Sequence, residues 1–256
     1  MEFPKIKAVP IPFTLYDFFG YLLPGITFGA LIIFSFDIRE AVHLVTNKIL
    51  GEADISHYPF LFKDFILLLH ESPWFISLFG LLVAYLLGHV LAALSSYFVE
   101  RLLVQSWLKY PTENMFGLSG KKKVFFFRNF RRSHSPNFIA QFKSQFETHF
   151  KIPLSSPNDI FWITWSFVAH NCPIAFARSS HFLNLYAFSR NLSMTFLMAA
   201  LLLFVFELFS CLTVHWLLIL LYCLIAVILY WNYLKLLRRL NDEVYRSFYA
   251  FVTGSD

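Results

Sequence analysis

Four apolar stretches, each near the length of a membrane span, dominate the hydrophobic pattern of the chain. They run from Leu15 to Phe36, from Trp74 to Phe98, from Leu192 to Phe209 and from Thr213 to Tyr233. Because an α-helix needs about 20 consecutive apolar residues to cross the hydrocarbon core, the pattern predicts four membrane-spanning helices. The link between the third and fourth stretches is very short, so these two helices should form an antiparallel hairpin.

The second stretch carries a small residue at every fourth position, and the first stretch has a shorter version of the same pattern. Small side chains allow helix backbones to approach closely in a bilayer, where hiding apolar surface from apolar lipid gains little. We therefore expect packing seams between helices, within one chain or between copies. The long seam consists of Gly80, Ala84, Gly88, Ala92 and Ser96, and the short one of Gly25 and Gly29.

The ionisable residues in or at the edge of these stretches include Asp17, His89 and Glu207. Such a group is costly in a span unless it faces protein or water. A helix-start role for Asp17 and a hydrogen-bonded neutral imidazole for His89 are the ordinary explanations. The alternative is a polar pathway through the bundle. Pro24, which lacks an N–H, should kink or interrupt the first helix beside that path.

The long segment between the second and third stretches is polar and basic. Its densest part mixes basic residues with phenylalanines, which is typical of a surface that contacts anionic lipid headgroups. A soluble protein partner is the alternative, and nucleic acid is the least expected ligand. The basic residues of this part are Lys121, Lys122, Lys123, Arg128, Arg131 and Arg132.

Beyond Tyr233, apolar residues recur at three- and four-residue steps as far as Phe251. This spacing predicts that the fourth helix continues out of the membrane. Its apolar seam should pack on residues 99–189 or self-associate as a short coiled coil.

Charge gives the orientation. Only 14% of the residues are charged, against about 25% in soluble domains. Residues 99–189 contain eleven lysines and arginines, whereas residues 37–72 contain three basic residues against six acidic ones. Because lysine and arginine accumulate on the cytoplasmic side, we expect both termini and the 99–189 segment to be cytoplasmic.

The predicted fold class is therefore all-α: a four-helix transmembrane bundle with a helical cytoplasmic segment between spans two and three and a cytoplasmic C-terminal helix. Residues 1–104 would form an N-terminal hairpin with an outer amphipathic loop. Residues 105–189 would form the basic segment, and residues 190–256 the C-terminal hairpin with its cytoplasmic helix.

No catalytic signature is present: the chain has no phosphate-binding loop, no nucleophile elbow and no zinc-protease motif. Its three cysteines are far apart, and its histidines have no chelating spacing. We expect neither an enzyme nor a metal or other cofactor.

Residues 16–25, with the sequence YDFFGYLLPG, residues 188–191 and residues 233–248 resemble uncharacterised multi-pass inner-membrane proteins of bacteria. Some of these are similar to membrane components of antiphage defence modules. The resemblance implies a bacterial inner-membrane location and transfers no catalytic residue.

Three functions follow as hypotheses. The first is a non-enzymatic component of a defence or stress module that forms homo-oligomers and perturbs the membrane, or forms a pore, on a signal from a cytoplasmic partner. The second is a small channel or transporter built on the polar pathway. The third is a membrane anchor for a soluble partner.

Overall fold

Every element of regular structure in the described part of the chain is a helix, as predicted. The computed structural model describes residues 15–35, 73–118, 130–153, 157–210 and 216–254. Four of its helices are long and apolar enough to cross a membrane, which is compatible with a multi-pass membrane protein. These candidate spans lie in Phe18–Ser35, Ser77–Met115, Pro173–Leu208 and Trp216–Gly254.

The first helix, residues 15–35, is called helix one here. It begins with α1 (Leu15–Asp17), passes through the π-helix η1 (Phe18–Leu22) and continues to Ser35. The second is α4 (Pro73–Ser95), which runs into a second π-helix, η2 (Ser96–Leu108). Three shorter helices follow: α5 (Pro111–Met115), α6 (Pro136–Phe150) and α7 (Pro157–Asn171).

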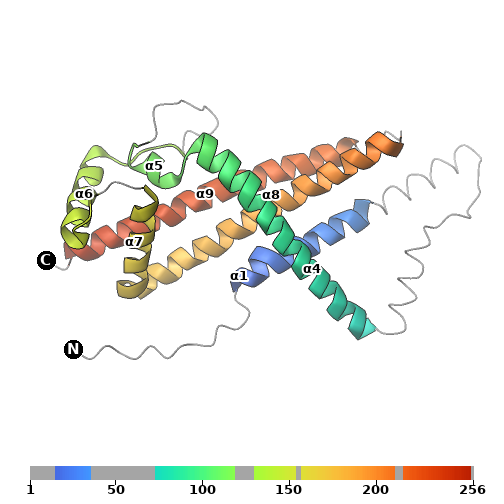
Figure 1. The fold of residues 1–256 in the computed structure, drawn as a ribbon, viewed down its shortest axis with the longest axis horizontal. Helices are drawn as coiled ribbons and strands as arrows, with labels where there is room; N and C mark the ends of the chain where they lie inside the picture. Colours follow the sequence, from blue (N-terminus) through green and yellow to red (C-terminus); the bar gives the residue numbers. More distant parts are fainter. Residues whose placement is uncertain (1–14, 36–72, 119–129, 154–156, 211–215, 255–256) are drawn as a thin grey trace, which may run out of the picture.

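The longest helices, α8 (Pro173–Ser210) and α9 (Trp216–Gly254), lie side by side along their length (Figure 1). They contain 38 and 39 residues, or about 57 Å each at 1.5 Å per residue. The hydrocarbon core is about 30 Å thick, so both helices reach well beyond it. The predicted continuation of the fourth helix is confirmed. The third helix also begins earlier than expected, because no helix-breaking residue lies between Pro173 and Leu192.

The start of α8 and the end of α9 form a helical cap together with α5, α6 and α7 (Figure 1). Its core is aromatic: the rings of Phe142 and Phe248 lie 5.4 Å apart, and those of Phe142 and Tyr245 lie 5.5 Å apart. The apolar seam of α9 therefore packs on the 99–189 segment of its own chain. The domain boundary expected at residue 189 falls inside α8, which belongs to both the cap and the bundle.

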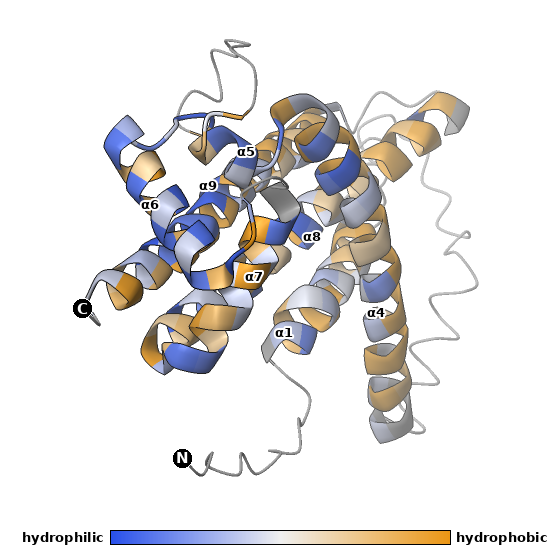
Figure 2. Cartoon of the chain, turned by 60° about the vertical axis from the view of Figure 1, so that its left-hand side comes forward, coloured by the Kyte–Doolittle hydropathy of each residue, from blue (hydrophilic) through white to orange (hydrophobic). Residues whose placement is uncertain are grey.

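The candidate span α4 and the cap helices α6 and α7 differ in hydropathy (Figure 2). α4 is apolar around most of its surface, whereas α6 and α7 alternate between polar and apolar positions. α7 packs on α8 and α9. α6 starts where the Ser135 side chain accepts a hydrogen bond from the Phe138 N–H, with Pro136 in the first turn.

Two hydrogen bonds set the direction of helix one. The Gly20 carbonyl accepts from Asn191 on α8, and the Ser35 hydroxyl pairs with Tyr222 near the start of α9. Helix one therefore starts at the cap end of the bundle, where α9 finishes (Figure 1). That this end is cytoplasmic stays a prediction. The outer loop, residues 37–72, and the basic residues Lys121, Lys122, Lys123 and Arg128 lie outside the described residues.

Candidate functional site

The two predicted seams meet where helix one crosses α4. A Cβ atom added to Gly25 would lie 1.8 Å from the Ala84 carbonyl oxygen, and one on Gly88 would lie 1.9 Å from the Tyr21 carbonyl oxygen. Neither position has room for a side chain, so the two backbones are in direct contact. These glycines hold helix one on α4 within the chain, and Ala84 and Ala92 are buried beside them.

The remaining members of the seams are not used in this way. A Cβ on Gly29 or on Gly80 would meet no atom within 4 Å. Ser96 is exposed on the outer side of the helix. The small-residue pattern therefore divides into a central part that packs on helix one and flanking positions that do not.

Pro24 has a different effect from the predicted interruption. In an α-helix the Gly20 carbonyl would accept from the N–H of residue 24, and proline has none. The backbone stays helical but takes π-helical geometry over Phe18–Leu22, with the Leu23 N–H bonded to the Phe18 carbonyl. Asn191 of α8 supplies the missing donor, because its Nδ2 lies 2.6 Å from the Gly20 oxygen.

The Asn191 side chain is the centre of a buried polar cluster. Its Oδ1 accepts from the Ser95 hydroxyl and, at 3.2 Å, from Arg190 Nε. Arg190 in turn forms an ion pair with Glu100 through Nη1 and Oε2. We call Ser95, Glu100, Arg190 and Asn191, with the Gly20 carbonyl, the Arg190 cluster. It joins helix one, the α4–η2 junction and α8.

Burial makes this cluster important for stability. The Arg190 side chain is 8% exposed and the Glu100 side chain 24%. A buried charge is tolerated only when it is paired and hydrogen-bonded, and removing one partner from such a pair costs about 3–5 kcal/mol. Both π-helical segments meet at this cluster, one through Gly20 and the other through Glu100. π-helical turns are frequent at functional sites.

Tyrosines cover the cluster on the side of α9. The Arg190 guanidinium lies 5.9 Å from the centre of the Tyr186 ring, and the Tyr186 and Tyr233 rings are 5.9 Å apart. Tyr233 is fully buried, and its hydroxyl has no hydrogen-bond partner among the described residues. The fourth long helix thus closes the cluster with rings rather than with charges.

The structure does not bring the three pathway residues together. Asp17 lies less than one turn before Gly20, while Glu207 is buried near the far end of α8. Glu207 follows Asn191 by 16 residues, about 24 Å along the helix. His89 stacks on Tyr21 of helix one with ring centres 3.9 Å apart, and its Nδ1 lies 2.9 Å from the Tyr85 carbonyl oxygen.

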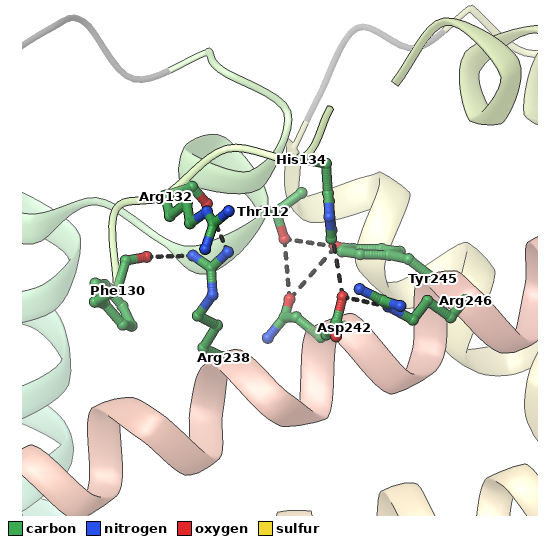
Figure 3. A network of polar contacts seen from close by, with 9 residues as sticks. Thr112, Phe130, Arg132, His134, Arg238, Asp242, Tyr245 and Arg246 are labelled. Carbon is green, nitrogen blue, oxygen red and sulfur yellow. Dashed lines mark hydrogen bonds and ion pairs between the residues drawn. The ribbon is translucent and has the colours of Figure 1, made fainter. Parts of the chain in front are cut away.

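In the cap, a second polar network fixes the segment 130–134 on α9 (Figure 3). Arg238 donates to the carbonyl oxygens of Phe130 at 2.7 Å and Arg132 at 2.6 Å. Behind it, the hydroxyls of Thr112 and Tyr245 lie 2.6 Å apart. Of the predicted basic surface, the structure describes Arg131 and Arg132, and the Arg132 side chain is exposed.

His134 ends this segment beside Asp242. Its Nε2 lies 3.4 Å from Asp242 Oδ1, within ion-pair distance, but it makes no hydrogen bond (Figure 3). Burial lowers the pKa of the His134 imidazole, and the neighbouring carboxylate offsets only part of this effect. The folded protein therefore favours the neutral form of His134.

Sequence reasoning missed the Arg190 cluster. Arg190 lies just before the predicted start of the third span, and it is buried against Glu100. The available signal was the four-residue offset between Gly20 and Pro24, which leaves a carbonyl without a donor. Nothing in the sequence pattern says that Asn191 is the side chain that reaches it.

Among the described residues, no group of three or more histidine, cysteine, aspartate or glutamate side chains is arranged to hold a metal ion. Comparisons with protein-family models, with curated proteins and with solved structures found no match.

Proposed function

We propose that this protein is a non-enzymatic membrane component that carries a signal from its helical cap to its membrane spans, where it perturbs the bilayer or lines a pore in an assembly of several copies. The observation that carries the proposal is the continuity of α8 and α9. Each is one unbroken helix that belongs to the cap at one end and to the bundle at the other.

The Arg190 cluster would be the point where cap motion acts on the spans. Arg190 and Asn191 lie on α8, while their partners Glu100 and Gly20 lie on η2 and helix one. A shift of α8 along η2 must break or exchange these contacts. Packed interfaces of this kind have discrete arrangements rather than a continuous range, which suits a two-state transition.

The cap would receive the signal through the 130–134 segment and the basic residues that precede it in the sequence. Phe130 packs in the same apolar cluster as Met194 and Tyr233, which places this segment next to the candidate spans. Arg131 and Arg132 follow directly. Anionic lipid headgroups are the ligand that this position favours, and a soluble protein partner would bind the outer part of the cap.

The role in bacterial defence or stress rests on the resemblance of residues 16–25, 188–191 and 233–248 to inner-membrane proteins. Two of these stretches supply Gly20, Arg190 and Asn191 of the Arg190 cluster, together with Pro24. That coincidence supports a shared mechanism, with the trigger supplied by a partner.

The test is induced expression in bacterial cells, with and without the neighbouring genes, while a potential-sensitive dye reports the membrane potential. We expect depolarisation in at least one setting. Arg238→Gln removes the two bonds that tie segment 130–134 to α9 and should reduce the response. Arg239→Gln removes the same charge from an exposed neighbour and serves as the matched control.

Two results would contradict the proposal. One is an unchanged potential in both genetic settings, with the protein present in the membrane at normal levels. The other is an equal response of the Arg238→Gln and Arg239→Gln variants, which would mean that the cap does not act through α9.

A membrane anchor for a soluble partner is the second candidate, and one observation favours it. Trp162 on α7 and Ile174 at the start of α8 are 62% and 79% exposed. Both residues lie in the cap, and Ile174 is at the opposite end of α8 from the apolar part of that helix. If anchoring is the function, Trp162→Ser should release the partner without altering the membrane potential. The channel hypothesis has less support, because Glu207 is buried near the far end of α8, away from Asp17.

A further inference from the structure

The outer face of α4 carries a heptad pattern of residues that stay exposed in the described part of the structure. Exposed residues recur at alternating steps of three and four from the middle of the helix into η2: Phe79, Leu82, Leu86, His89, Ala93 and Ser96. We call this row the α4 outer seam. Ala93, nine residues after Ala84, points to the opposite side of the helix from the face that packs on helix one, whereas His89 lies at the border of that face, because its ring stacks on Tyr21.

Two members of the seam are unsuited to lipid. His89 and Ser96 are polar and exposed, and both belong to a candidate span. The Nδ1 atom of His89 is bonded within the helix and one face of its ring stacks on Tyr21, but Nε2 makes no hydrogen bond among the described residues. Polar groups in a span face protein or water rather than hydrocarbon chains.

We infer that the α4 outer seam pairs with the same seam of a second copy of this chain. A strict seven-residue repeat is the pattern by which two parallel helices pack into each other in a left-handed supercoil. All copies cross the membrane in the same direction, so pairing about an axis along the membrane normal places equal positions at equal depth. His89 would meet His89 of the second copy, and Ala93 would allow close approach beside it.

This inference rests on the proposed function, since it names the surface through which copies of the protein assemble. It also moves the contact away from the centre of the predicted seam, with which the outer seam shares only Ser96. Gly88 and Ala84 are already occupied by helix one, whereas the members of the outer seam stay exposed in the described part of the structure, although the His89 ring also stacks on Tyr21. A polar residue at one position of an apolar repeat is a known device for fixing register and number of chains.

The experiment is disulfide cross-linking in native membranes, in a background with Cys172, Cys211 and Cys223 replaced by alanine. Ala93→Cys lies in the seam, and Val83→Cys is the matched control on an exposed part of α4 outside it. Mild oxidation should produce a dimer band for Ala93→Cys that is at least tenfold stronger than for Val83→Cys. No band at Ala93→Cys, or equal bands for both variants, would overturn the inference.

The polar contact has its own readout, the dimer dissociation constant in nanodiscs or detergent. His89→Leu should weaken the dimer by about three- to tenfold, the range for one hydrogen bond between membrane helices. His89→Asn, which keeps a polar group in the seam, should retain most of the affinity. An unchanged constant for His89→Leu would show that the imidazole does not stabilise the pair.

These results are separable from those of the membrane-potential test. A chain that depolarises cells without cross-linking at Ala93→Cys would overturn this interface and leave the proposed function standing. A clean dimer that leaves the potential unchanged would support the interface and contradict the proposed function.

Discussion

The Arg190–Glu100 pair gives the sharpest test of how the bundle is held together. Arg190→Met should remove the positive charge while keeping most of the side-chain volume, and it should leave Glu100 unpaired. Loss of one partner of a buried ion pair costs about 3–5 kcal/mol. Because the Glu100 side chain is 24% exposed, water can solvate part of the unpaired carboxylate. We therefore expect Arg190→Met to lower the free energy of unfolding by about 3 kcal/mol.

The double variant separates a stranded charge from a net attraction. With Arg190→Met and Glu100→Met together, no charge is left unpaired, and replacing a buried pair by apolar side chains is often close to neutral. The double variant should therefore recover most of the loss. A coupling energy of about 2 kcal/mol or more from the double-mutant cycle would establish that the two residues act as a unit.

The assay is reversible unfolding in bicelles or mixed micelles, followed by helix content or by steric trapping. Arg246→Met is the control, because Arg246 forms an exposed pair with Asp242 four residues earlier and should lose about 0.5 kcal/mol or less. Single variants that cost less than about 1 kcal/mol would refute the reasoning. So would a double variant that loses the sum of the two single values.

Three further outcomes are expected. Gly25→Ala should destabilise the protein by about 1–3 kcal/mol, because the added Cβ would collide with the Ala84 backbone. Gly29→Ala adds a Cβ in open space and should be neutral or stabilising by up to about 1 kcal/mol. Equal shifts in melting temperature for the two variants would contradict this prediction. Asn191→Leu should leave the Gly20 carbonyl without a donor and lower the stability of the protein. Pro24→Ala restores a backbone N–H at residue 24, so Asn191→Leu should cost less in that variant than in the protein with Pro24. An equal cost of Asn191→Leu with Pro24 and with Ala at this position would exclude the role assigned to Pro24. Because the pKa of His134 is lowered in the folded state, the unfolded chain takes up the proton first as the pH falls below about 6.5. The free energy of unfolding should therefore decrease on acidification from neutral pH, and His134→Gln should show less of this decrease. The same pH dependence of the free energy of unfolding in both proteins would contradict the prediction.

The sequence by itself determined the helical class and the number of candidate spans. Both follow from the lengths of apolar runs, because a bilayer imposes a length on any helix that crosses it. The continuation of the last span also followed from local periodicity, since Leu237, Leu240, Val244 and Phe248 repeat at helical steps and are buried in the structure. Patterns of this kind depend on residues close together in the chain.

The tertiary structure decided which small residues matter. Gly25 and Gly29 look the same in the sequence, as do Gly80 and Gly88, but only Gly25 and Gly88 touch the backbone of another helix. Four-residue spacing places residues on one face of a helix, and it does not say which part of that face a neighbour crosses. The crossing point depends on the tilt of helix one relative to α4, which is a property of the whole bundle.

The same reason explains the Arg190 cluster. The presence of Pro24 in the sequence indicates that one carbonyl of helix one lacks its usual N–H donor, which is a local property of the chain. The donor comes from Asn191, at a separation of 171 residues, and the partner of Arg190 is Glu100, at a separation of 90. Charge and hydropathy give the cost of burying such groups, but only the packing of helix one, α4 and α8 brings their partners within reach.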